Sequence, residues 1–209
     1  MDVVFDFKGD PIGGKLINYL LEKSRVIFQQ DGERNFHSFY NLIYGASDQE
    51  LKEYSLKASD ITKYRYLNQG GPSLNLIGDD KQSFRVVNES MKTSNFDPSL
   101  IKTIWSIVAS IIHLGNLQFE SNEKDINNNS DNNMNGQAKL SDQSMNEIKL
   151  ISKLLKFEEN ELKKALTTRL IASGSKELVT KTHSVKEAFY ARDALAKVTL
   201  KWDKRKFRH

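Results

Sequence analysis

The sequence predicts one mixed α+β domain, mostly helical, in which several packed helices accompany two β-hairpins. Two observations lead to this fold class. Apolar residues recur at helical spacing over most of the chain, most clearly between residues 97 and 116. Two pairs of short β-prone runs, each pair separated by a glycine-containing turn, lie near the N-terminus and near residue 175.

The first pair of runs occupies residues 1–21. Val3–Phe7 is a short β-prone run, Gly9–Gly14 is a cluster of turn residues, and Lys15–Leu21 can form the second strand. This segment therefore predicts a hairpin with a longer loop.

Residues 35–117 are predicted to be the main helical part. Apolar residues recur at i, i+3, i+4 and i+7 from Phe36, and Gly45 stands where a glycine commonly ends a helix. Ser47 and Glu50 have the spacing of a capping box, so a short helix is expected next.

The central helix of this part follows an irregular stretch at 64–85, in which Gly70–Pro72 and Gly78–Asp80, including Asp79, are expected to break regular structure. Asp97 is a favourable N-cap, Pro98 suits the first helical position, and Gly115 is expected to stop the helix. The broad apolar face comprises Leu100, Ile101, Ile104, Trp105, Val108, Ile111 and Ile112. A helix this apolar is expected to lie at the centre of the core.

An asparagine-rich segment at 121–137 contains almost no apolar residues. Such a composition cannot bury enough area to offset the entropy lost on ordering, so a disordered insertion is predicted.

Residues 140–197 are predicted to hold helices and the second hairpin. Ser144 and Glu147 suggest a capping box for a helix whose buried stripe is Ile148, Ile151, Leu154 and Leu155, and a short helix is expected near 160–166. Runs at 167–172 and 178–182 then flank the second turn. Ser184 and Glu187 are expected to cap the last helix, which carries Phe189, Leu195 and Ala196.

Composition excludes several classes. The chain has no cysteine, so it has neither a disulfide framework nor a thiolate metal site. No transmembrane segment is expected, because the most apolar run, Trp105–Leu117, is interrupted by serine, histidine and glycine. The last thirteen residues hold six Lys and Arg against one Asp, whereas the rest of the chain is close to neutral.

One motif suggests phosphate binding at first sight. Gly9–Lys15 nearly matches the phosphate-binding loop, but Leu16 stands where that loop needs a hydroxyl for magnesium, and Pro11 removes an amide. A hairpin turn is the favoured interpretation.

Other candidate groups also favour structural roles. His37 and His113 lie on predicted helices beside apolar residues and share no metal-ligand spacing, so core or interface histidines are expected. Glu33 and Arg34 are interpreted as an internal ion pair. No catalytic, nucleotide-binding or metal-binding residue is therefore predicted.

Four segments, in order, resemble the motor head of myosins, most closely class I. They are YLLEKSRV at Tyr19–Val26, GERNFHSFY at Gly32–Tyr40, IIHLGNLQF at Ile111–Phe119 and YARDALAK at Tyr190–Lys197. The resemblance covers residues 1–197 and implies the upper actin-binding subdomain of a P-loop NTPase-type head. The family is an actin-activated ATPase that uses ATP and magnesium, located in the cytoplasm on the actin cytoskeleton.

The resemblance also implies a site. The second hairpin resembles the family's actin-contacting loop, which places the contact at Arg169, Ser173, Gly174, Ser175, Lys176 and Glu177. Glu177 lies sixteen positions before Asp193, where the family has an acidic or phosphorylatable residue. The implied partners are the actin filament, bound weakly, and the remainder of a myosin head.

The phosphate-binding loop and switches of the family are not recognisable in this sequence, and residues 198–209 depart from its pattern. We therefore expect part of a motor that is inactive alone and needs no cofactor. Two alternatives stay open. One is a basic-tailed helical protein that binds nucleic acid or acidic membrane through 198–209, although one short tail is weak evidence for a nucleic-acid partner. The other is a non-functional truncated gene product.

Overall fold

A computed structural model gives the fold and describes residues 2–15, 22–71, 79–122, 134–172 and 178–200. The helices are α1 (His37–Gly45), α2 (Asp48–Glu53), α3 (Asp80–Thr93), α4 (Pro98–Asn116), α5 (Asp142–Leu155), α6 (Glu159–Thr167) and α7 (Val185–Leu200), with 3₁₀ turns η1 (Lys23–Val26) and η2 (Ala58–Lys63). The strands are β1 (Asp2–Phe5), β2 (Pro11–Lys15), β3 (Phe119–Ser121), β4 (Ala138–Leu140), β5 (Thr168–Ala172) and β6 (Leu178–Thr182). They form three separate antiparallel pairs, so the mixed, mostly helical fold class is confirmed as far as the structure describes the chain.

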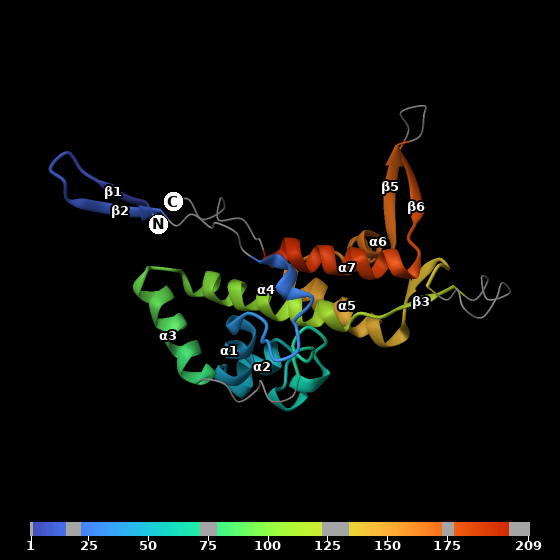
Figure 1. The fold of residues 1–209 in the computed structure, drawn as a ribbon, viewed down its shortest axis with the longest axis horizontal. Helices are drawn as coiled ribbons and strands as arrows, with labels where there is room; N and C mark the ends of the chain where they lie inside the picture. The colour runs from blue at the N-terminus through green and yellow to red at the C-terminus, as the bar shows by residue number, and fades with distance from the viewer. Residues whose placement is uncertain (1, 16–21, 72–78, 123–133, 173–177, 201–209) are drawn as a thin grey trace.

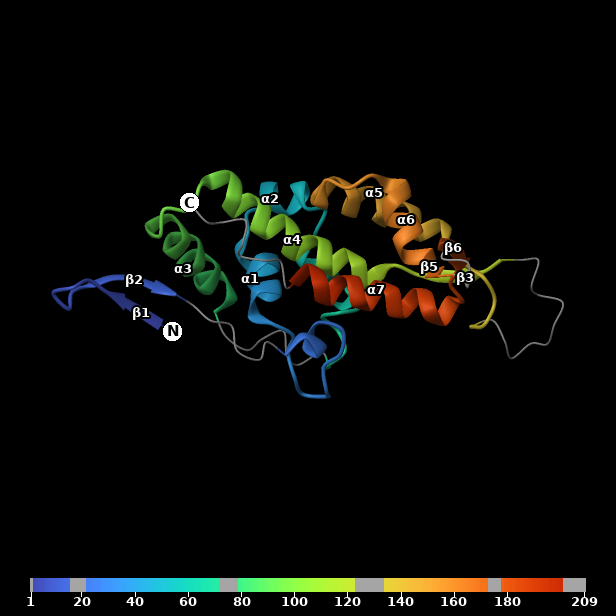
Figure 2. The same ribbon diagram turned by 90° about the horizontal axis from the view of Figure 1, so that it is seen from above.

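Helix α4 is the centre of the body (Figures 1 and 2). It packs against α1, α3, α5 and α7, and its C-terminal half is almost fully buried. The predicted start is confirmed: the Ser99 backbone N–H donates to Oδ1 of Asp97 at 2.8 Å, and Pro98 occupies the first turn. By length and composition alone α4 could cross a membrane, but more than half of its most apolar window is buried inside the protein, as in a core helix.

Helix α1 ends at Gly45 as predicted, whereas α4 extends one residue beyond Gly115. Close packing gives both glycines a further role. A Cβ added to Gly45 would lie 2.2 Å from Cβ of Phe84, and one added to Gly115 would lie 2.8 Å from the ring of Tyr66. Helix α4 continues through Asn116. The glycines allow α3 and the Tyr66 ring to approach the two helices.

Helix α3 corrects the prediction of an irregular stretch at 64–85, because residues 80–85 are helical. Asp79, interpreted as part of a chain breaker, is the N-cap, and its Oδ1 accepts from the Gln82 backbone N–H at 2.8 Å. Aspartate is common both in turns and at helix N-caps, so its presence at position 79 did not distinguish an irregular segment from the start of a helix.

The first hairpin is confirmed, but its turn lies earlier than predicted. Asp6 forms the turn: its Oδ1 accepts from the backbone N–H groups of Lys8 and Asp10, and Gly9 has φ +84°. Pro11 is therefore a strand residue, located opposite Phe5 where the register shifts. The predicted second strand at 16–21 lies outside the described residues.

The asparagine-rich segment needs a correction at its ends. Ser121 belongs to β3, which pairs with β4, and this small sheet was not predicted. Residues 134–137 are also ordered: the Gly136 carbonyl accepts from Val185 N–H, and the Gln137 carbonyl accepts from Asn122 N–H, each at 3.0 Å. The middle of the segment, 123–133, lies outside the described residues.

Helix α5 begins earlier than the predicted capping box. Ser141 is at the N-cap position, and the Ser144 hydroxyl instead exchanges hydrogen bonds with the backbone of Gln118, at 2.8 and 3.1 Å. Glu147 accepts from the buried His113 at 2.7 Å, and the other ring nitrogen of His113 faces the Tyr54 carbonyl at 2.8 Å. Both ring nitrogens thus have partners, which confirms His113 as a core histidine.

A buried arginine on α7 links that helix to the end of α4. Arg192 is 1% exposed and donates to the backbone carbonyls of Gly115 and Leu117 at 3.3 and 3.0 Å. Its charge is paired with Asp193 at 2.7 Å, and Asp193 also accepts from the hydroxyl of Tyr66 at 2.6 Å. Burial raises the pKa of Tyr66 well above its usual value, so this hydroxyl remains a donor.

Candidate functional site

The second hairpin, β5–β6, projects from the body (Figure 1). Its strands pair from Thr168 opposite Thr182 to Ala172 opposite Leu178, which confirms the predicted hairpin. Nine of its ten strand residues are exposed, and Thr168 at the base is half-buried. The hairpin therefore contributes no side chain to the core.

The outer part of this hairpin is apolar on both faces. Leu170, Ile171, Leu178 and Val179 are 39–67% exposed. A strand pair that buries neither face normally carries polar residues, so this composition indicates a surface that a partner covers. The sequence predicted a hairpin but gave no basis for knowing that both faces would be uncovered.

The structure divides the predicted contact residues into two groups. Arg169 is described and is located near the hairpin base, where its guanidinium pairs with Glu187 of α7 at 3.1 Å. Ser173, Gly174, Ser175, Lys176 and Glu177 lie outside the described residues. In the sequence they stand between the end of β5 and the start of β6.

Glu187 connects three parts of the hairpin base. The Ser184 backbone N–H donates to its Oε2 at 2.8 Å, and the Glu187 N–H donates to the Ser184 hydroxyl at 3.3 Å, so the predicted capping box is confirmed. The Ser184 N–H and the Arg169 cation hold the pKa of Glu187 below its usual value. The carboxylate is therefore charged near neutral pH and joins the helix start to β5.

The near-match to a phosphate-binding loop is a strand. Residues 11–15 pair with β1, with Lys15 opposite Asp2 and Gly14 opposite Val3. Backbone groups in a sheet ladder point along the sheet plane and do not encircle an anion. The predicted hairpin turn over Gly9–Lys15 is therefore wrong for residues 11–15, which form β2, although the segment does belong to a hairpin.

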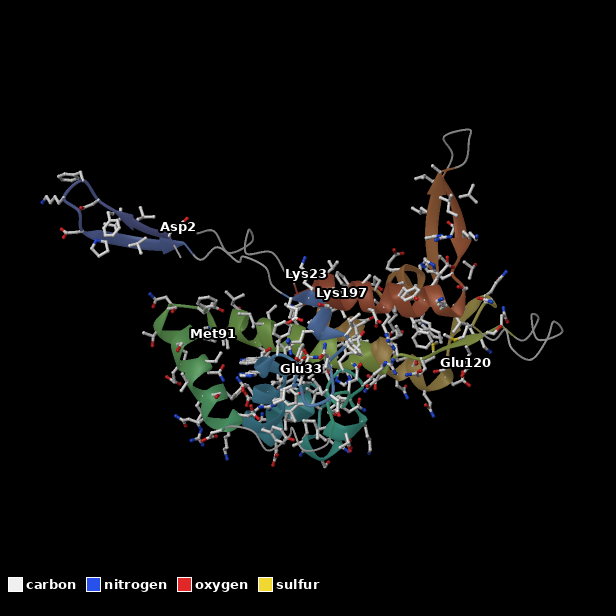
Figure 3. The ribbon with its side chains drawn as sticks, viewed as in Figure 1. Asp2, Lys23, Glu33, Met91, Glu120 and Lys197 are labelled. Atoms are coloured by element: carbon white, nitrogen blue, oxygen red, sulfur yellow. The ribbon has the colours of Figure 1, made fainter. Side chains whose placement is uncertain are left out.

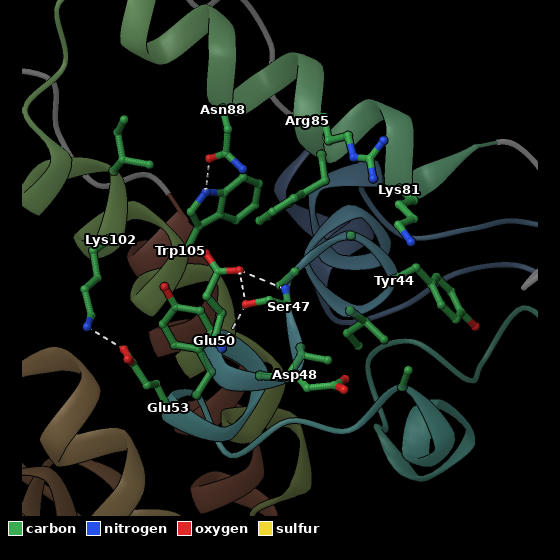
Figure 4. Close-up of a pocket in the computed structure, with 18 of the residues that line it drawn as sticks. Tyr44, Ser47, Asp48, Glu50, Glu53, Lys81, Arg85, Asn88, Lys102 and Trp105 are labelled. Atoms are coloured by element: carbon green, nitrogen blue, oxygen red, sulfur yellow. Dashed lines mark hydrogen bonds and ion pairs between the residues drawn. The ribbon is translucent and has the colours of Figure 1, made fainter.

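A hollow of about 940 Å³ lies between α2, α3 and α4 (Figure 4). Phe84 and Trp105 both line it, with ring centroids 4.9 Å apart and ring planes tilted by 42°, and the Trp105 indole N–H donates to Asn88 at 2.9 Å. Its acidic side is already paired in part, because Glu53 forms an ion pair with Lys102. We assign no chemistry to this hollow.

The remaining candidate groups have structural roles. Glu33 and Arg34 do not form the predicted pair with each other: Glu33 pairs with Arg25 at 3.0 Å, and Arg34 pairs with Asp80 at 2.6 Å. Within the described ranges, no three side chains of the types His, Cys, Asp and Glu are grouped as metal ligands would be.

Comparison with known proteins gives a family match. The model of the myosin head (motor domain) matches residues 1–203. Unconventional myosin ID of Drosophila melanogaster is 42% identical over 94% of this chain, unconventional myosin-Id of Homo sapiens is 43% identical over 94%, and unconventional myosin-Ig of Mus musculus is 39% identical over 94%. The chain covers 18%, 18% and 19% of these proteins, so it spans about a fifth of the length of the relatives it matches.

Proposed function

The chain belongs to the myosin head (motor domain) family, and we propose that it forms the actin-facing wall of a class I-type motor head. On this proposal the β5–β6 hairpin contacts the actin filament, and the chain acts in the cytoplasm on the actin cytoskeleton. The motor activity belongs to a complete head, of which this chain supplies the part described above.

The observation that carries the proposal is the uncovered hairpin. It projects from the body, has aliphatic side chains on both faces, and is anchored only at its base. Figure 3 shows its side chains standing clear of the helices. One hairpin buries too little area for a stable interface, so the contact is weak by itself.

Two other exposed surfaces support a second partner, the remainder of a motor head. The β1–β2 pair has exposed Val4 and Phe5, and its outer edges pair with no other strand of the described residues, which favours pairing with further strands. Tyr190 and Val198 stand two turns apart on α7 and are 62% and 68% exposed. An apolar row on a helix indicates a face that another element covers.

Co-sedimentation with actin filaments tests the proposed contact. We expect a saturable pelleted fraction that falls several-fold in the double variant Leu170→Ser with Val179→Ser, because the aliphatic contact area is lost. Phe157→Ser is the matched control, since Phe157 lies outside the hairpin, between α5 and α6, and is 56% exposed. Equal pelleting of all three proteins would contradict the proposal.

We also propose that the chain alone does not bind ATP. Phosphoryl transfer needs phosphate-cradling amides, a lysine, magnesium ligands and a positioned water, and the one near-match is engaged in a strand ladder. A calorimetric titration with magnesium-ATP should show no binding. A dissociation constant tighter than about 1 mM, or roughly −4 kcal/mol, would overturn this expectation.

Glu177 is proposed to supply the permanent negative charge of the hairpin. A carboxylate at this position gives the charge that a phosphate would otherwise add, so the contact needs no kinase. Grafting residues 167–190 into an intact class I head should make its actin activation independent of heavy-chain phosphorylation. If the grafted head still required the kinase, the assignment would fail.

A further inference from the structure

Packing alone does not fix the direction in which the β5–β6 hairpin points. One face carries Arg169 and Ile171 with their cross-strand neighbours Lys181 and Val179. A hollow of about 690 Å³ borders this face, between Ile171, Val179 and Lys181 on one side and His183 and Glu187 on the other. None of the residues that line this space belongs to the buried core, so packing on this side does not fix the angle of the hairpin.

The described contacts at the base are of two kinds. Backbone hydrogen bonds from His183 N–H to the Thr167 carbonyl (2.7 Å) and from Ala138 N–H to the His183 carbonyl (2.8 Å) hold the two strand ends. Both bonds lie just outside the paired strands, before Thr168 and after Thr182, so they can serve as a pivot for the hairpin. The Arg169–Glu187 ion pair, at 3.1 Å, is a side-chain link between the outward part of β5 and α7.

We propose that Glu187 is a positioning residue that holds the hairpin at a fixed angle to α7 through Arg169. This inference rests on the proposed actin contact only for its functional consequence. Its geometric basis is that Glu187 is itself immobilised by the Ser184 N–H, so little further side-chain freedom is lost when Arg169 pairs with it. A modest attraction is sufficient because the strand residues of the hairpin are almost all exposed, so few packing contacts compete with it.

This assignment changes the role of Arg169. The family resemblance placed it among the contact residues, whereas its guanidinium is directed to α7 at 3.1 Å. Its cross-strand neighbour Lys181 is a second exposed cation on the same face, and no ion pair is seen for it within the described residues. We therefore expect Arg169 to act by orienting the hairpin, with Lys181 and the aliphatic residues at the contact.

The test measures the hairpin angle directly. The chain has no cysteine, so spin labels can be placed on Thr180→Cys in β6 and Ala194→Cys in α7, both at exposed positions. Pulsed electron resonance should give one narrow distance distribution for the otherwise unchanged full chain. Glu187→Gln, which can still accept from the Ser184 N–H, should widen it at least twofold, and Glu161→Gln on α6 should leave it unchanged.

Reversing the charges of Arg169 and Glu187 distinguishes an effect on the hairpin angle from a general loss of structure. Arg169→Glu alone should widen the distribution, and Arg169→Glu combined with Glu187→Arg should narrow it again. High salt should widen the distance distribution of the unaltered chain, because salt screens an exposed ion pair. It should leave the distribution of Glu187→Gln unchanged, since that variant has no ion pair to screen. A distribution in Glu187→Gln as narrow as in the unaltered chain, or no narrowing in the double reversal, would overturn the proposal.

Co-sedimentation of the same variants with actin filaments distinguishes a failure of the Glu187 proposal from a failure of the proposed actin contact. If Glu187→Gln reduces pelleting with filaments and the double reversal restores it, the angle controls the contact. If no form of the chain pellets, the proposed actin contact fails while the distance measurement still decides whether Glu187 sets the angle. Circular dichroism confirms that each variant retains its helices.

Discussion

Replacing Arg192 with methionine should cost about 3–5 kcal/mol of unfolding free energy, because it breaks a buried, hydrogen-bonded ion pair. The change leaves the carbonyls of Gly115 and Leu117 without this donor and Asp193 without its closest cation. A domain is stable by only about 5–15 kcal/mol, so a large share of the protein should unfold. Urea unfolding followed by far-ultraviolet circular dichroism measures the loss.

Lys186→Met is the matched control for Arg192→Met. It removes a cation from the same helix at an exposed position and should change the unfolding free energy by no more than about 0.5 kcal/mol. An Arg192→Met protein within about 1 kcal/mol of the unaltered chain would show that the buried arginine does not hold α7 to α4.

Gly115→Ala should destabilise the protein by about 1–3 kcal/mol, the usual cost of overpacking. Helix propensity acts in the opposite direction, since alanine within a helix is favoured over glycine by about 0.5–1 kcal/mol. The cost of overpacking should exceed the gain in helix propensity, because the new Cβ would lie 2.8 Å from the Tyr66 ring. That ring cannot easily move, since its hydroxyl donates a hydrogen bond to Asp193.

A double-mutant cycle with Tyr66→Ala tests this explanation. In that background the ring is absent, so Gly115→Ala should be neutral or stabilising. Gly13→Ala is the control for glycine replacement as such, because a Cβ there would meet nothing within 4 Å. The same destabilisation by Gly115→Ala with and without Tyr66 would exclude the packing explanation.

Local sequence signals predicted the elements that depend on local chemistry. The cap at Asp97, the box at Ser47 and Glu50, and the box at Ser184 and Glu187 all form as expected, because each needs only a side chain and a nearby backbone N–H. Sequence could not reveal why Gly45 and Gly115 are glycines, since both reasons come from residues distant in the chain.

The same limit applied to the site. Spacing and glycine content predicted the hairpin around residue 175, and family resemblance indicated its role. Neither could show that Arg169 pairs with Glu187, because that contact depends on where β5 leaves α6 relative to the start of α7. Asp79 and Ser144 were assigned the wrong local role, since a residue type that caps helices also occurs in turns and tethers.

Photo-cross-linking to actin filaments tests the central claim most directly, because it captures weak contacts. A benzophenone side chain is placed at Leu178 on the hairpin or at Phe157 on the body, positions that are 67% and 56% exposed. The account predicts an actin adduct from Leu178 and little or none from Phe157. Equal yields from the two positions, or an adduct from Phe157 alone, would contradict the assignment of the β5–β6 hairpin as the actin contact.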